Sequence, residues 1–152
     1  RLSVEDDAGW GPAESVELAK VVKPMGVDVI DCSSGGMLGR PVDGSGPVGY
    51  GYQVPYAERL RREAGVMTMA VGLIVHADQA EEILQNGRAD LVALAREMLY
   101  NPNWPMDAAQ KLGFDADFTS VPAPQSYWLA KRAASIKDMV PSTYRPALDK
   151  KA

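Results

Sequence analysis

A chain of 152 residues, 46% hydrophobic and 24% charged, has the composition of a soluble globular protein with one compact domain. Its net charge of -4, without basic clusters interleaved with aromatic residues, argues against nucleic acid as a partner. One cysteine and one histidine argue against an internal disulfide and a metal centre, and the apolar runs are shorter than the roughly 20 residues that span a bilayer. Residues 1–7 also lack the apolar core of a signal peptide, so we expect a cytoplasmic protein without a membrane partner.

The first predicted helix covers residues 12–25. Pro12 suits the first helical position, Glu14 and Glu17 suit the positive end of the helix dipole, and Gly26 provides a stop. The helix is expected to bury a broad apolar face that consists of Val16, Leu18, Ala19, Val21, Val22 and Met25. A β-branched run at 27–32 predicts a strand, and the glycine-rich segment 33–51 predicts a long functional loop.

The same cycle then occurs twice more. Pro55 begins a predicted helix that ends at Ala64, Gly65 caps it, and residues 66–71 are expected to form a strand. The third cycle is a helix opened by a capping box of Asp78 and Glu81 and closed by Asn86-Gly87, followed by a strand at 89–94. This alternation predicts a parallel sheet, either open and doubly wound or closed as a barrel, and the pattern does not choose between them.

Beyond residue 97 the pattern predicts helices and loops. A helix is expected from Trp104 to Leu112, a loop from Gly113 to Pro124, and a final helix over 125–138. We predict that residues 1–140 form the folded domain and that residues 141–152 form a loosely held tail.

Ligands of parallel α/β proteins bind beyond the carboxyl ends of the strands, which here are residues 33–36, 72–74 and 95–97. Small residues in the last two segments allow backbone N–H groups to approach an anion, and Arg96 adds a guanidinium that suits phosphate. These segments therefore predict a phosphate site. The alternatives are a simple tight turn at Gly72 and a salt bridge at Arg96.

Five segments, in this order, resemble motifs of the Old Yellow Enzyme family of NADPH:flavin oxidoreductases, and the subgroup of xenobiotic reductases and NADPH dehydrogenases in particular. The segments are DVIDCSSGG at 28–36, GYQVPYA at 51–57, AVGLI at 70–74, AEEILQNGRAD at 80–90 and AREML at 95–99. The resemblance covers roughly residues 1–130. It implies the α/β fold of the C-terminal half of a (β/α)8 TIM barrel, from the end of strand five through strand eight and the C-terminal helices.

The resemblance also implies site residues. Arg1 would contact the pyrimidine edge of FMN and stabilise negative charge at N1 and O2, while Gly72 with Leu73, and Ala95 with Arg96, would bind its phosphate. The family commonly has glycine where this chain has Ala95, so close backbone approach there requires an ordinary backbone conformation.

Four further residues have a structural and a functional interpretation. Cys32 is expected to be a buried packing residue, and His76 a surface residue ahead of a helix. Trp104 is expected to anchor the core. Trp128 resembles an aromatic residue that some family members insert into a neighbouring subunit's active site, although simple packing at a subunit contact is an equal alternative.

The resemblance implies an FMN-dependent NAD(P)H oxidoreductase of the ene-reductase type, with NADPH as reductant, an activated alkene as substrate and a homo-oligomeric assembly. The catalytic acid and the substrate-anchoring pair belong to the N-terminal half of that barrel, so no catalytic residue is expected here and the chain alone is expected to be inactive. Two alternatives remain: a non-catalytic half-barrel module that assembles with another chain, and an open α/β domain that binds a nucleotide.

Overall fold

The computed structural model describes residues 10–34 and 49–136. The chain divides into two compact units, Arg1–Phe114 and Asp115–Ala152. Arg1, most of the expected loop at 33–51 and the expected tail at 141–152 lie outside the described residues. No helix within the described ranges is long and apolar enough to cross a membrane.

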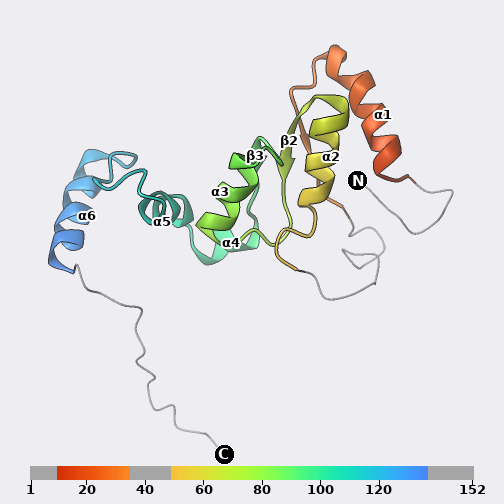
Figure 1. The fold of residues 1–152 in the computed structure, drawn as a ribbon. Coiled ribbons are helices and arrows are strands. Elements are labelled where there is room, and N and C mark those ends of the chain that lie inside the picture. Colours follow the sequence, from red (N-terminus) through yellow and green to blue (C-terminus); the bar gives the residue numbers. More distant parts are fainter. Residues whose placement is uncertain (1–9, 35–48, 137–152) are drawn as a thin grey trace, which may run out of the picture. The chain divides into compact units, whose positions relative to one another are not determined.

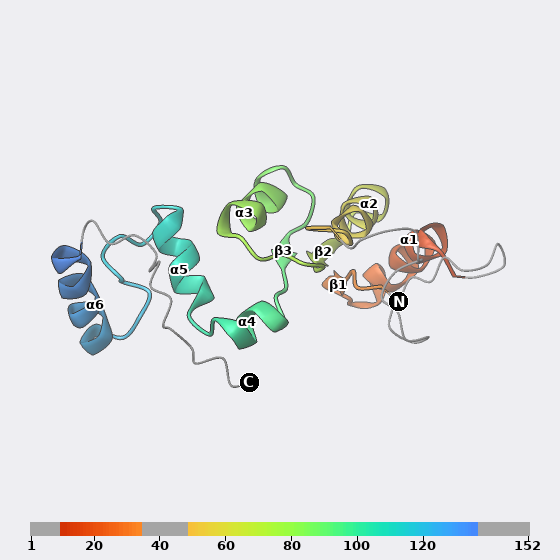
Figure 2. The same cartoon turned by 90° about the horizontal axis from the view of Figure 1, so that it is seen from below.

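The first unit contains a small parallel sheet (Figures 1 and 2), as the alternation of elements predicts. Its strands are β1 (Val29–Asp31), β2 (Met67–Ala70) and β3 (Leu91–Val92), in the order β1-β2-β3. Val29 is in register with Met67, and Met69 with Leu91. The strands are shorter than the apolar runs suggest. Single hydrogen bonds, such as Cys32 N–H to the Met69 carbonyl at 3.0 Å, continue the pairing beyond β1.

The first helix ends earlier than expected. Helix α1 spans Pro12–Val22, and a 3-10 turn, η1, covers Lys23–Met25 before Gly26 adopts a left-handed conformation. Pro24 explains the difference, because it has no N–H to donate to an α-helical hydrogen bond. The prediction for Glu14 is confirmed: its carboxylate accepts a hydrogen bond from the Gly11 N–H at 2.8 Å. Hydrogen bonds from the backbone amides of Glu14 itself and of Gly11 lower the pKa of this carboxyl group.

Helix α2 (Val54–Ala64) has Pro55 in its first turn and left-handed Gly65 as its cap, as expected. Helix α3 spans Ala77–Gln85, and here the predicted capping box was wrong. The helix begins after His76, so the residue three positions later is Gln79, whose side chain accepts hydrogen bonds at the helix start. Glu81 lies farther along and pairs with Gln85 at 2.6 Å.

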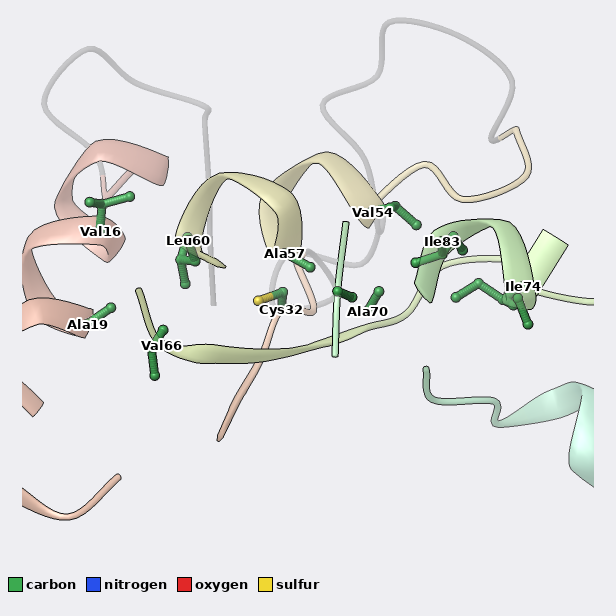
Figure 3. Close-up of a cluster of buried hydrophobic side chains, with 12 residues drawn as sticks. Val16, Ala19, Cys32, Val54, Ala57, Leu60, Val66, Ala70, Ile74 and Ile83 are labelled. Carbon is green, nitrogen blue, oxygen red and sulfur yellow. The ribbon is translucent and has the colours of Figure 1, made fainter. Parts of the chain in front are cut away.

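Helices cover one face of the sheet. Thr68 and Ala70 of β2 are fully buried against them. Figure 3 shows the buried core, in which side chains of α1, α2 and α3 meet those of β2 and the segments around it. The core consists of Val16, Ala19, Cys32, Val54, Ala57, Leu60, Val66, Ala70, Ile74, Ala80, Ile83 and Ala89. The opposite face of the sheet is open within the described residues, and Met67 and Leu91 are 50% and 49% exposed there.

The expected apolar face of the first helix is only partly buried. Val16 and Ala19 are in the core, but Leu18, Val21 and Met25 are 46%, 60% and 76% exposed. Helical spacing alone does not separate the buried residues from the exposed ones, because only the residues that face α2 and the sheet pack against other described residues.

Two elements differ from expectation in the rest of the chain. A short helix, α4 (Arg96–Tyr100), follows β3 where none was predicted, and α5 (Trp104–Lys111) follows it as expected. In the second unit, α6 (Ala123–Ser135) begins two residues earlier than predicted. Pro124 therefore lies in the first turn of α6, where backbone N–H groups have no acceptor within the helix, so its lack of an N–H costs no hydrogen bond. Only Pro122 is extended before the helix.

Candidate functional site

A cavity of about 340 Å³ lies where β2 and β3 end. Its lining consists of residues 71–75, residues 93–97, Tyr52 and Tyr100. The cavity therefore brings together Gly72, Leu73, Ala95 and Arg96, the four residues in the described ranges that the sequence predicts for phosphate binding.

Gly72 is required by its backbone and by its surroundings. Its φ of 114° is rarely adopted by residues with a side chain. A Cβ at this position would lie 3.1 Å from the Gln53 Cβ, the Gln53 backbone N and the Tyr52 Cε1. The segment at 52–53 thus packs directly on Gly72, and both features favour glycine.

The residues after Gly72 form a turn whose shape is held by side chains. Leu73 has a left-handed φ of 52°, which is uncommon for a residue other than glycine. Gln79 Nε2 donates to the Leu73 carbonyl at 3.1 Å, and Gln79 Oε1 accepts from the Val75 N–H at 2.9 Å. Trp104 Nε1 donates to the Val75 carbonyl at 2.7 Å, which confirms Trp104 as an anchor against the core.

Backbone donors remain in this turn. The N–H groups of Gly72, Leu73 and Ile74 make no hydrogen bond within the described part of the chain. Unpaired amides that border a cavity are suited to an anion, since each can donate to a phosphate oxygen.

Arg96 supplies positive charge on the other side of the cavity. Its side chain is exposed, and no carboxylate of the described residues pairs with it, including Glu97, which lines the same cavity. The alternative of a structural salt bridge at Arg96 therefore has no support in the described ranges. Ala95 has a φ of -106° and a ψ of -81°, so its φ is not left-handed, but its backbone lies outside the ordinary β and helical regions.

Gln53 connects the end of the first strand to the site. Gln53, which is 2% exposed, donates from Nε2 to the Ser34 carbonyl at 2.8 Å and to the Ser34 hydroxyl at 3.0 Å. Gln53 thereby links the end of β1 to Gly72. Ser33 lines a different cavity, of about 310 Å³, together with Trp10 and Cys32.

The predictions for Cys32 and His76 are confirmed. Cys32 is 3% exposed, and burial is the main reason that the pKa of its thiol is raised to about 11, with the charge of Asp31 contributing further. This thiol is therefore protonated at neutral pH and unsuited to act as a nucleophile. His76 is an exposed residue immediately before α3, and its ring makes an edge contact with Tyr50 at 5.2 Å. No group of three potential metal ligands occurs within residues 10–34 and 49–136.

Trp128 lies on α6, in the second unit. Its side chain is 67% exposed and packs edge-to-face with Tyr127, with 5.2 Å between ring centroids. Lys131 Nζ lies 5.3 Å from the Trp128 ring centroid and 4.6 Å from that of Tyr127. No residue of α6 is buried, so internal packing within the described residues does not account for this tryptophan.

Sequence reasoning missed the two glutamines that shape the site. Gln53 falls inside a motif that resembles the family, but its side-chain bonds span 19 residues and leave no local pattern. Gln79 carries a usable signal, because glutamine three positions after a helix N-cap is typical of a capping box. The error of two residues in the helix start hid it.

Comparison with known proteins identifies the family. Residues 1–114 match the family described as NADH:flavin oxidoreductase / NADH oxidase. The chain is 50% identical over 134 residues to an NADPH dehydrogenase of Halalkalibacterium halodurans, which covers 85% of this chain and 37% of that protein. It is 52% identical over 115 residues to an NADPH dehydrogenase of a Geobacillus species, covering 74% of this chain and 33% of that protein.

A third relative, an NADPH dehydrogenase of Bacillus subtilis, is 43% identical over 129 residues, which are 84% of this chain and 36% of that protein. The chain thus spans about a third of the length of the curated relatives that it matches. Three quarters of its residues fall within the family match, and the matched segment contains the whole cavity with its glycine turn and its unpaired arginine. On these grounds the chain belongs to the NADH:flavin oxidoreductase / NADH oxidase family, the Old Yellow Enzyme family.

Proposed function

We propose that this chain supplies the phosphate-binding part of an FMN-dependent NAD(P)H oxidoreductase of the ene-reductase type. The observation that carries the proposal is the cavity beyond β2 and β3, which is lined by backbone amides and an exposed arginine that have no partner among the described residues. Family membership and relatives named NADPH dehydrogenase support FMN as the cofactor and NADPH as the reductant.

The residues present fit a phosphate group. Gly72 and Leu73 offer backbone N–H groups, and the Arg96 guanidinium offers a charged fork that matches phosphate oxygens. Ala95 has no left-handed φ that would demand glycine. In our proposal these four residues hold the FMN phosphate.

Bound FMN would relay a hydride from NAD(P)H to the β-carbon of an activated alkene. The protein's part in that chemistry is to place charge and exclude water. We propose that the Arg1 guanidinium stabilises negative charge at the flavin N1 and O2. Trp128, exposed on α6, would form an apolar wall of the substrate site of a neighbouring subunit in a cytoplasmic homo-oligomer.

We further propose that residues 1–140 form the C-terminal half of a TIM-barrel domain, with residues 141–152 as its tail. Three parallel strands with helices on one face and exposed Met67 and Leu91 on the other resemble a barrel segment whose inner face lacks its remaining strands. Under this proposal the 152 residues alone do not reduce an enone, because the acid that completes the reaction lies in the other half.

The test compares FMN with riboflavin, which has the same ring system but no phosphate. Arg96→Ala in the complete protein should weaken FMN roughly ten- to hundredfold, the effect of one lost charged hydrogen bond, and leave riboflavin nearly unchanged. Affinities come from flavin fluorescence titrations of flavin-free protein.

Arg62→Ala is the matched control. Arg62 lies on α2, and its side chain is 70% exposed. Its ion pair with Glu63 is long, with 3.7 Å between the nearest nitrogen and oxygen atoms. If Arg96→Ala binds FMN as tightly as the control does, the phosphate role of Arg96 is wrong.

A second candidate, a non-catalytic half-barrel module that pairs with another chain, has one observation in its favour. Apolar side chains are exposed on the open sheet face, at Met67 and Leu91, and at Val21 of α1 and Met25 of η1. This candidate predicts that the 152-residue chain forms a stable assembly in sedimentation experiments and shows no preference for FMN over riboflavin.

A further inference from the structure

Gln79 makes bonds to both ends of the turn that lines the phosphate cavity. Its Nε2 donates to the Leu73 carbonyl at 3.1 Å, and its Oε1 accepts from the Val75 N–H at 2.9 Å and the His76 N–H at 3.4 Å. The side chain is half-buried and lies outside the cavity lining. Gln79 therefore contacts the turn without lining the cavity.

The turn needs such support because its backbone is strained. Leu73 has a φ of 52°, and a leucine reaches this left-handed region only when surrounding contacts compensate for the strain. The Leu73 carbonyl, which Gln79 holds, belongs to this same residue. Releasing that carbonyl would allow Leu73 to return to an ordinary backbone conformation and would redirect the neighbouring N–H groups.

A second contact holds the turn from another element. Trp104 Nε1 donates to the Val75 carbonyl at 2.7 Å, so both polar groups of the Val75 backbone are engaged. The N–H groups of Gly72, Leu73 and Ile74 remain without acceptors among residues 10–34 and 49–136. The support is thus selective. The Leu73 carbonyl and both polar groups of the Val75 backbone are bonded to protein, whereas the N–H groups of residues 72–74 are left for a ligand.

We propose that Gln79 is a positioning residue, which keeps the turn at residues 72–75 in the conformation that presents backbone N–H groups to a phosphate. This inference rests on the proposed function and adds a residue that does not touch the ligand. The amide of Gln79 donates to the Leu73 carbonyl and accepts from the Val75 amide at once, which neither a carboxylate nor a thioether of similar length does.

Two variants separate the bond that Gln79 donates to Leu73 from the bonds that it accepts from Val75 and His76. Gln79→Met keeps the length of the side chain and removes all three of its hydrogen bonds. Gln79→Glu keeps the acceptor for the Val75 and His76 amides, and with it the helix start, but it removes the donor to Leu73. It remains informative should Gln79→Met fail to fold. Gln85→Met is the control, because Gln85 lies on the same helix, is exposed, and has a side chain that bonds only to Glu81 among the described residues.

The measurement is the affinity of each flavin-free variant of the complete protein for FMN and for riboflavin, with the melting temperature recorded alongside. We expect both Gln79 variants to lose roughly tenfold in affinity for FMN and to bind riboflavin within about twofold of the parent. The loss in Gln79→Glu should shrink as salt is added, since its new negative charge repels phosphate. Gln85→Met should change neither affinity.

An equal loss for FMN and riboflavin would make Gln79 a merely structural residue, and no loss for either would also refute the proposal. Arg96→Ala keeps this failure distinct from failure of the proposed function. If Arg96→Ala lowers FMN affinity selectively and the Gln79 variants do not, only the role of Gln79 is wrong. If Arg96→Ala has no selective effect, the phosphate site itself is wrong.

Discussion

The strongest structural prediction concerns Gly72→Ala. The substitution adds one methyl group at a residue whose φ is 114°, and that group would lie 3.1 Å from the Cβ and the backbone N of Gln53. One of these neighbours is backbone, which cannot rotate away as a flexible side chain would. Either the turn or the segment at residues 52–53 must therefore shift.

The magnitude follows from two contributions. A non-glycine residue in a sparsely populated backbone region costs about 1–3 kcal/mol, and an extra methyl group in a well-packed site typically costs about 1–3 kcal/mol. Gly26 isolates the first contribution, because its φ is 100° and a Cβ there would have nothing within 4 Å. Gly72→Ala should thus lower the free energy of unfolding by about 1–3 kcal/mol more than Gly26→Ala does.

Urea titrations of both variants in the flavin-free protein give the free energies of unfolding. FMN titrations should show weaker binding for Gly72→Ala alone, because the displaced turn carries the proposed phosphate donors. Equal destabilisation by the two substitutions would show that close packing of residues 52–53 on Gly72 has no energetic consequence, and the reasoning would be refuted.

Four other outcomes are expected. Arg1→Ala should lower the reduction potential of the bound flavin in a spectroelectrochemical titration, since a positive charge beside N1 favours the reduced state; an unchanged potential would refute that placement. Trp128→Ala should change the ratio of kcat/KM for bulky and small enones more than flavin content, whereas unchanged specificity with a dissociated oligomer in sedimentation would leave Trp128 as an interface anchor. Cys32, with its pKa raised to about 11 by burial, should react with iodoacetamide at pH 8 far more slowly in the folded protein than in urea, and equal rates would contradict its burial. Asp115 has its pKa lowered to about 2, chiefly by hydrogen bonds from the side chain and backbone of Ser120. Because the folded pKa lies below the ordinary value of 3.8, the stabilisation is complete above about pH 4 and is lost as pH falls towards 2. Asp115→Asn should remove that part of the pH dependence of unfolding, and an identical profile for variant and parent would refute the assignment.

Much of the first unit can be predicted from the sequence. Pro12 and Pro55 locate two helix starts, Gly65 locates a helix end, and short apolar runs after the helices locate three parallel strands. These features are local, because proline fixes φ and glycine tolerates positive φ whatever surrounds them. The candidate phosphate residues also follow from the sequence, since the carboxyl ends of parallel strands must meet at one edge of the sheet.

Other features depend on which parts of the chain meet. The sequence predicts one broad apolar face on a helix over residues 12–25, but the structure buries Val16 and Ala19 and leaves Val21 of α1 and Met25 of η1 exposed. The family's glycine at residue 95 does not say which backbone conformation Ala95 adopts, and the structure gives it a φ of -106° and a ψ of -81°, outside the ordinary β and helical regions. Neither outcome can be read from residue type, because each depends on the backbone path and on the neighbours that it brings.

The shape of the candidate site was decided by tertiary structure alone. The Gln53 bond to Ser34 spans 19 residues, and the Trp104 bond to Val75 spans 29. Sequence periodicity reports the preferences of a residue and its near neighbours along the chain, whereas a hydrogen bond between distant segments exists only after packing has fixed the distance between them. The sequence by itself therefore determined where the turn at residues 72–75 would lie, and packing determined what holds its strained backbone in place.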